Sequence, residues 1–133
     1  MKILIASHGK FAEGIISAAN IIVGNLEDVT FINAYVDGID FKKELKNYFD
    51  KNKDVLVLTD LFGGSVNQEV MQYIYSHNLQ VITGINLPLI LEILIANNNG
   101  CLQDVNEIVK NSQTQLIYVN ETLKNMSTVD DFD

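Results

Sequence analysis

The chain has 133 residues, of which 47% are hydrophobic and 20% charged, and this balance is typical of one folded domain rather than a disordered segment. Its net charge of −8 argues against nucleic acid as a partner, because nucleic-acid-binding faces carry an excess of lysine and arginine. No apolar stretch approaches the roughly 20 residues of a membrane span, and the single cysteine, Cys101, excludes an internal disulfide, so we expect a cytoplasmic protein that does not insert directly into a membrane.

The first half of the chain alternates short apolar runs with amphipathic segments. Residues 2–7 predict a strand buried on both faces, and residues 10–23 repeat apolar side chains at helical spacing. Residues 28–35 are rich in β-branched and aromatic residues and predict a second strand. Residues 40–52 predict a helix that Asp40 caps.

The second half continues this alternation. Residues 54–60 predict a strand, residues 65–77 a helix and residues 79–84 a further strand. Pro88 predicts the start of another helix, because proline is favoured in the first turn of a helix. The remaining predicted elements are a helix over 101–113, a strand over 114–120 and a loose tail over 121–133.

This order of elements predicts a single doubly wound α/β domain over residues 1–133. We expect a mostly parallel sheet of order 2-1-3-4 with helices on both faces, plus a C-terminal edge strand. Strands 1 and 3 are neighbours in this order, and the topological switch point lies between their carboxyl ends. Ligands bind at such points, so functional groups are expected there.

Two polar residues end the predicted neighbouring strands. The first strand ends at His8 and the third at Asp60, and adjacent strands lie about 4.8 Å apart. A carboxylate that accepts the Nδ1–H of a histidine fixes its tautomer and leaves the Nε2 lone pair free. The same negative charge favours the positive ring that forms during nucleophilic attack, so we predict that His8 is a nucleophile oriented by Asp60.

A glycine-rich turn follows Asp60. Gly63 and Gly64 allow the backbone to approach a ligand, and the helix after them offers N–H groups and the positive end of its dipole. Ser65 either caps this helix or donates its hydroxyl to an anion, and Gly9 opens the first helix in the same way. The turn predicts a phosphate-binding site, although its spacing matches neither a P-loop nor a G-x-G-x-x-G fingerprint.

Other residues of the same rim are predicted to form walls of the site or to contact a partner. They are Phe11, Asp37, Gly38, Phe62, Asn86 and Pro88. His8, Asp60 and Asp37 are suitable metal ligands by type, but their spacing matches no metal motif. We therefore predict neither a metal nor a cofactor.

Three motifs in order resemble those of a known family. They are "SHGKFAEG", "DLFGGSVNQ" and "TGINLPLILE". Residues 1–125 are similar to the EIIA component of the mannose/fructose/sorbose family of the bacterial phosphoenolpyruvate-dependent sugar phosphotransferase system (PTS). The resemblance implies an α/β fold and a homodimer in which a C-terminal strand joins the sheet of the partner, so residues 121–133 are a candidate exchange segment.

The resemblance also implies roles for individual residues. His8 matches the histidine that HPr phosphorylates and that passes the phosphoryl group to EIIB, and Asp60 matches its carboxylate partner. Ser65 with its glycines matches the phosphate cradle, although Val66 stands where many members have proline. EIIB is expected to be a separate protein through which the chain associates with a membrane permease complex.

Several alternatives stay open. A subunit that feeds dihydroxyacetone kinase shares the histidine but usually lacks the "FGGS" form. A receiver-like signalling domain needs acidic residues at the end of strand 1, where Ser7 and His8 stand. A hydrolase could be built from Ser65, His8 and Asp60, but the sequence lacks the G-x-S-x-G elbow of such enzymes. A non-catalytic binding module is the remaining alternative, and it requires an inert His8. The sequence does not indicate which sugar is transported.

Overall fold

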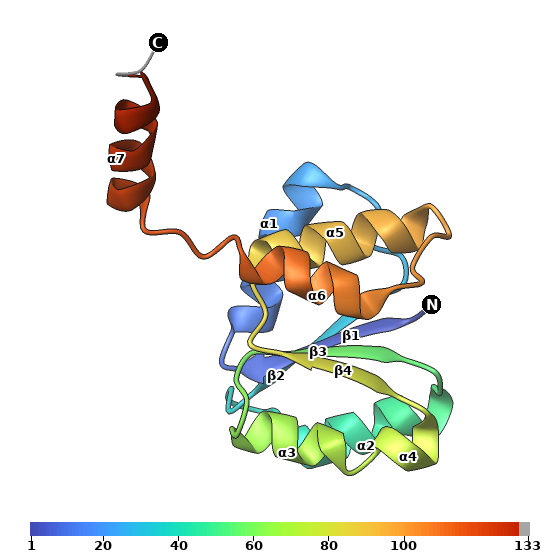
Figure 1. Cartoon of the computed structure of the whole chain (residues 1–133). Helices are drawn as coiled ribbons and strands as arrows, with labels where there is room; N and C mark the ends of the chain where they lie inside the picture. The colour runs from blue at the N-terminus through green and yellow to red at the C-terminus, as the bar shows by residue number, and fades with distance from the viewer. Residues whose placement is uncertain (131–133) are drawn as a thin grey trace.

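Four parallel strands form the sheet that the alternating pattern predicts (Figure 1). They are β1 (Ile3–His8), β2 (Val29–Ala34), β3 (Leu56–Thr59) and β4 (Gln80–Thr83). The strand order in this computed structural model, which describes residues 1–130, is β2-β1-β3-β4. The predicted order 2-1-3-4 is confirmed, and β1 lies between β2 and β3.

The register of the strands brings their carboxyl ends to one edge of the sheet. Ala6 of β1 lies opposite Thr59 of β3, and His8 lies opposite Ala34 at the end of β2. The residues that follow these three strands therefore meet at the same edge, as expected for a topological switch point.

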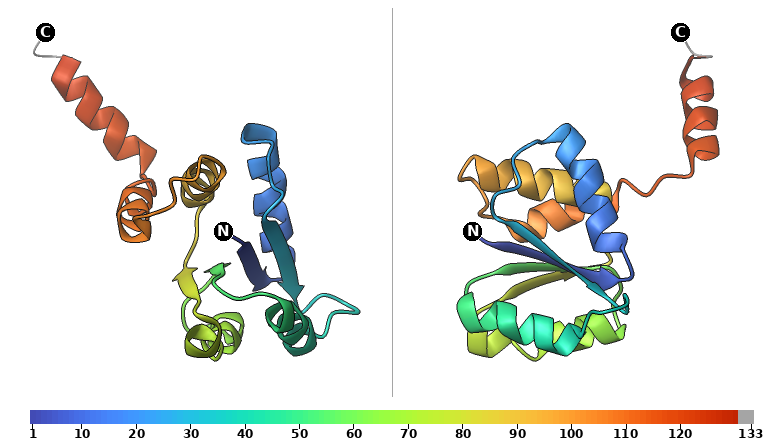
Figure 2. Two further views of the ribbon diagram at one scale, coloured as in Figure 1. Left: turned by 90° about the vertical axis from the view of Figure 1, so that its right-hand side faces the viewer. Right: turned by 180° about the vertical axis from the view of Figure 1, so that it is seen from behind.

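Helices cover both faces of the sheet (Figure 2). One layer holds α1 (Phe11–Ile22), α5 (Leu87–Asn98) and α6 (Val105–Gln113). The other layer holds α2 (Phe41–Lys51), α3 (Ser65–Met71) and α4 (Ile74–His77). None of the helices within residues 1–130 has the length and apolarity that crossing a membrane requires.

The core consists of two apolar layers that the alternation of β1 separates. Ile3 and Ile5 pack with α1, α5 and α6, whereas Leu4 and Ala6 pack with α2 and α3. Successive side chains of a strand point to opposite faces, so one apolar strand serves both layers. This double burial explains why β1 has no polar residue before Ser7.

The predicted helix over 65–77 is wrong in one respect, because the chain forms two shorter helices there. The Tyr73 N–H donates to the Val70 carbonyl, three residues back, and this bond tightens the backbone between α3 and α4. The Tyr73 ring packs on Phe49 with centroids 4.7 Å apart. Asn78, in the left-handed conformation, then ends α4.

The predicted C-terminal edge strand is also wrong. Among the described residues the sheet has four strands, and residues 114–118 form a turn and an extended stretch that leads to α7 (Val119–Asp130). A strand requires a free sheet edge beside it, and in this chain the segment runs away from the sheet (Figure 1). The tail predicted to be loose over 121–133 is helical as far as Asp130, and residues 131–133 lie outside the described part of the chain.

Candidate functional site

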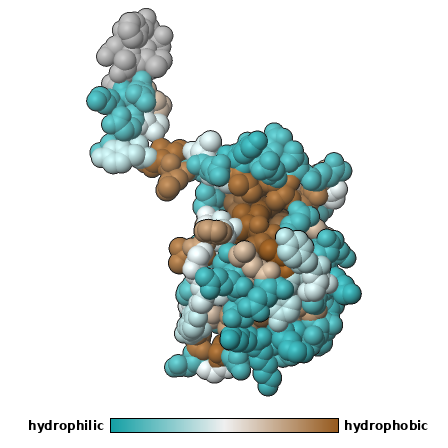
Figure 3. Space-filling view, turned by 60° about the horizontal axis from the view of Figure 1, so that its bottom comes forward, coloured by the Kyte–Doolittle hydropathy of each residue, from teal (hydrophilic) through white to brown (hydrophobic). Residues whose placement is uncertain are grey.

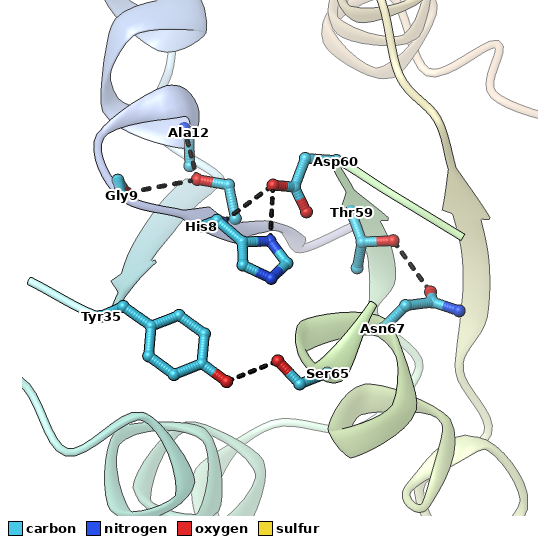
Figure 4. A network of polar contacts seen from close by, with 9 residues as sticks. His8, Gly9, Ala12, Tyr35, Thr59, Asp60, Ser65 and Asn67 are labelled. Atoms are coloured by element: carbon cyan, nitrogen blue, oxygen red, sulfur yellow. Dashed lines mark hydrogen bonds and ion pairs between the residues drawn. The ribbon is translucent and has the colours of Figure 1, made fainter. Parts of the chain in front are cut away.

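His8 and Asp60 are in direct contact at the carboxyl edge of the sheet (Figure 4). Asp60 Oδ2 accepts a hydrogen bond from the backbone N–H of His8 and lies 2.9 Å from Nδ1 of its ring. The side chain of His8 is 38% exposed and that of Asp60 only 13%. The carboxylate is thus held inside the protein, while the imidazole reaches solvent.

This contact determines which ring nitrogen is available for chemistry. When Nδ1 carries the proton and donates it to Oδ2, the lone pair of Nε2 points away from Asp60. Asp60 Oδ1 is buried and has no hydrogen-bond partner in the described part of the chain, so Oδ2 makes the polar contacts of this carboxylate. The arrangement is that of an oriented imidazole with a carboxylate behind it.

Gly64 lets the chain pass close to the imidazole. A Cβ at this position would lie 3.1 Å from Cε1 of His8 and 3.4 Å from Cδ2 of Leu61. Gly63 has a φ of +77°, a conformation that glycine adopts without steric strain. The two glycines therefore have separate roles, one in turning the chain and one in admitting the His8 ring.

Ser65 is the first residue of α3 but its hydroxyl does not cap that helix. Its Oγ instead contacts the phenol oxygen of Tyr35 (Figure 4). Of the two roles predicted for Ser65, capping is therefore wrong. A Ser-His-Asp hydrolase gains no support either, because the Ser65 hydroxyl is bonded to Tyr35.

Gly9 connects β1 to the start of α1, and its predicted role in binding phosphate stays a prediction. Gly9 has a φ of +53°, and its N–H donates to the Ala34 carbonyl at 2.8 Å. The buried Ser7 accepts a hydrogen bond from the Ala12 N–H at 2.7 Å and so stabilises the first turn of α1. The sequence pattern gives no sign of this contribution from Ser7.

Tyr35 is a site residue that the sequence does not single out. It follows β2, and its ring stacks on the imidazole of His8 with centroids 5.5 Å apart and planes at 24°. The sequence predicts only that Asp37 and Gly38, which follow this strand, form a wall of the site. The rule that selects His8 and Asp60, a polar residue at the carboxyl end of a strand, applies equally to Tyr35.

A buried hydrogen bond attaches α3 to the end of β3. Thr59 Oγ1 donates to Asn67 Oδ1 at 2.8 Å, and both residues are buried. The bond holds the first turn of α3, and with it Gly64, near the end of β3. These two residues likewise have no signature in the sequence.

The remaining predicted wall residues lie in different surroundings. Phe11 and Phe62 are exposed on α1 and on the loop after β3, and Asp37 and Gly38 lie in the turn after β2. Asn86 and Pro88 begin α5. The Asn86 side chain accepts from the Leu89 N–H and donates to the Ser112 carbonyl, so it joins α5 to α6, and its contact with a partner stays a prediction.

Within residues 1–130, no group of three or more His, Cys, Asp or Glu side chains is placed to hold a metal ion.

Comparisons with known proteins converge on one family. The profile of the family described as "PTS system fructose IIA component" matches residues 2–113. The fructose-specific EIIA component of Bacillus subtilis is 28% identical, over 96% of this chain and 92% of its own length. The crystal structure of a PTS IIA protein associated with the fucose utilization operon of Streptococcus pneumoniae superimposes with a TM-score of 0.78 at 32% identity. That alignment covers 92% of this chain and 95% of the other.

One group of relatives is much longer than this chain. The mannose-specific EIIAB component of Escherichia coli is 31% identical over 73% of this chain, but the match covers only 32% of its own length. The chain thus spans about a third of the length of these EIIAB relatives.

Proposed function

We propose that this chain carries a phosphoryl group on Nε2 of His8. The premise is that the chain belongs to the mannose/fructose family of PTS EIIA components. The donor is phospho-HPr and the acceptor is a separate EIIB component. The contact of His8 with Asp60 carries the proposal, because Asp60 occupies Nδ1 and so directs Nε2 away from the carboxylate, on a side chain that is 38% exposed. The protein acts in the cytoplasm and reaches a membrane permease complex through EIIB.

Phosphorylation of His8 proceeds by in-line displacement. Nε2 attacks the phosphorus of phospho-HPr, the new N–P bond forms, and the N–P bond of the donor breaks with its electron pair staying on the donor nitrogen. Nδ1 of His8 keeps its proton throughout, and this N–H donates a hydrogen bond to Asp60. Transfer to EIIB is the same displacement with His8 as the leaving group.

The phosphoryl oxygens require donors, since they carry negative charge in the transition state. The Ser65 hydroxyl and the backbone N–H groups at the start of α3 supply them. Gly64 places this backbone against the edge of the imidazole. Because donor and product both hold phosphorus on nitrogen, the transfer is close to reversible and suits a relay.

The surroundings of His8 support docking of a protein partner. Phe11, Leu61 and Phe62 are large apolar side chains exposed near the end of the sheet at which His8 lies. Exposed apolar groups around a polar centre are typical of protein–protein contact surfaces. HPr and EIIB are the partners that this rim serves in turn.

We further propose that two copies form a homodimer through the segment after α6. Leu116, Ile117, Tyr118 and Val119 are exposed, and Figure 3 shows hydrophobic surface where this segment joins the C-terminal helix. β4 pairs only with β3 among the described strands, so its second edge is open to a segment of another copy.

The phosphoryl carrier proposal is tested by intact-mass analysis after incubation with phosphoenolpyruvate, enzyme I and HPr. The wild type should gain one phosphate that is labile to acid and stable to base, and His8→Ala should gain none. His77→Gln, which changes the other histidine of the chain, should label like the wild type. Labelling of His8→Ala, or acid-resistant labelling, would overturn the proposal.

A further inference from the structure

Tyr35 has a backbone conformation that bulky side chains rarely adopt. Its φ is +61°, in the left-handed region, where an aromatic residue is sterically disfavoured. Residues held in this way persist where the surrounding structure requires them, and they gather at functional sites. The left-handed backbone of Tyr35 is thus the first indication that this residue has a functional role.

Burial does not explain the conformation of Tyr35. The residue is 68% exposed, so it contributes little to the core. The left-handed turn instead directs its ring from the end of β2 across His8 toward α3 (Figure 4). Its two contacts, the stacked imidazole and the Ser65 hydroxyl, are both groups of the proposed phosphoryl site.

The pair of hydroxyls has one proton more than its mutual hydrogen bond uses. When the Tyr35 phenol donates to Ser65 Oγ, the proton of Ser65 remains free to donate to a third group. Accepting a hydrogen bond polarises a hydroxyl and makes it a stronger donor. The phenol is also the more acidic of the two hydroxyls, which favours this direction.

We propose, on the basis of the proposed function, that Tyr35 is a positioning residue whose phenol donates to Ser65 Oγ and thereby aims and strengthens the Ser65 hydroxyl as a donor to the phosphoryl group on His8. The stacked ring covers one face of the imidazole. The phenol oxygen of Tyr35 acts through Ser65, with which it shares a hydrogen bond. Removal of the phenol oxygen should therefore have an effect only while Ser65 has a hydroxyl.

The test is a double-mutant cycle on the rate of His8 phosphorylation, with Tyr35→Phe, Ser65→Ala and the double variant. Two donors are used, namely phospho-HPr and phosphoramidate, which transfers its phosphoryl group to histidine nitrogen and releases ammonia without any protein partner. Tyr75→Phe is the matched control, since Tyr75 on α4 is 98% exposed. Thermal unfolding of each variant verifies its fold.

Ser65→Ala should slow labelling about tenfold, since it removes a hydrogen bond to a charged group. Tyr35→Phe should slow it about threefold to tenfold, and the double variant should match Ser65→Ala, because the two residues act as one unit. Tyr75→Phe should leave the rate unchanged. A Tyr35→Phe rate equal to wild type, or an effect of equal size in the Ser65→Ala background, would overturn the proposal.

The two donors separate this inference from the function on which it rests. Labelling by phosphoramidate with the expected cycle, but none by phospho-HPr, would support the role of Tyr35 and overturn the proposed donor. Wild-type labelling by both donors with an additive cycle would overturn the role of Tyr35 alone. A wild type that neither donor labels on His8 would overturn both.

Discussion

Asp60 holds His8 at two atoms through a single oxygen, because Oδ2 lies 2.9 Å from both the backbone nitrogen and Nδ1 of that residue. One carboxylate oxygen after β3 thus fixes the end of β1 and the rotation of the imidazole together. The orientation of Nε2 therefore depends on the sheet as well as on side-chain packing.

Asp60→Asn should slow phosphorylation of His8 by about 10- to 100-fold, since a hydrogen bond to a charged group contributes about 1.5–3 kcal/mol. The amide retains one acceptor oxygen but removes the negative charge behind the imidazole. The time course of mass gain with phospho-HPr measures the effect. Asp28→Asn, at an exposed ion pair with Lys2, is the control and should label normally. A wild-type rate in Asp60→Asn would show that the carboxylate does not orient the ring.

Gly64→Ala should slow labelling, because the start of α3 lies close to His8. The added methyl group would lie 3.1 Å from Cε1 and displace the ring. Gly14→Ala is the matched change, because Gly14 lies within α1 and a Cβ there has no neighbour within 4 Å among the described residues. It should raise the free energy of unfolding by about 0.5–1 kcal/mol without changing the labelling rate. Equal labelling of both variants would contradict the proposed approach.

The stability of the protein should decline at alkaline pH through Tyr48. Burial raises the pKa of this phenol to about 12, whereas an unfolded tyrosine titrates near its usual value of about 10. The unfolded chain therefore releases this proton first, and the free energy of unfolding should fall as the pH rises from about 10 to 12. Denaturant unfolding at several pH values measures the decline.

Tyr48→Phe should remove the Tyr48 part of that decline. Its hydroxyl oxygen is buried and has no hydrogen-bond partner within residues 1–130, so its removal should leave stability at neutral pH equal or higher. The control is Tyr75→Phe, which should keep the decline because Tyr75 is exposed. An unchanged alkaline decline in Tyr48→Phe would contradict the assignment.

The C-terminal segment should determine the oligomeric state. Light scattering coupled to size exclusion should give a dimer for the wild type, and a monomer for a chain with both Leu116→Ser and Ile117→Ser. Ile21→Ser, at an exposed isoleucine of α1, is the control and should remain dimeric. A monomeric wild type, or a dimer that survives both substitutions, would exclude this interface.

The pattern of residue types along the chain is enough to predict the layered fold and the central pair of the site. Apolar runs too short for helices, separated by amphipathic segments, favour a parallel sheet, and neighbouring strands of such a sheet end at one edge. His8 and Asp60 follow from that rule, because each ends a strand of the predicted order. Local pattern suffices wherever burial alone selects the structure.

Other features of the site depend on contacts between distant segments, which appear only in the folded chain. The left-handed turn at Tyr35, its stacking on His8 and its bond to Ser65 join three elements that no periodicity relates. The close approach of Gly64 to His8 likewise depends on how α3 lies against β1. Residues 114–120 resemble a strand in composition, yet a strand also requires an edge to pair with, and the fold of one chain does not bring β4 to them.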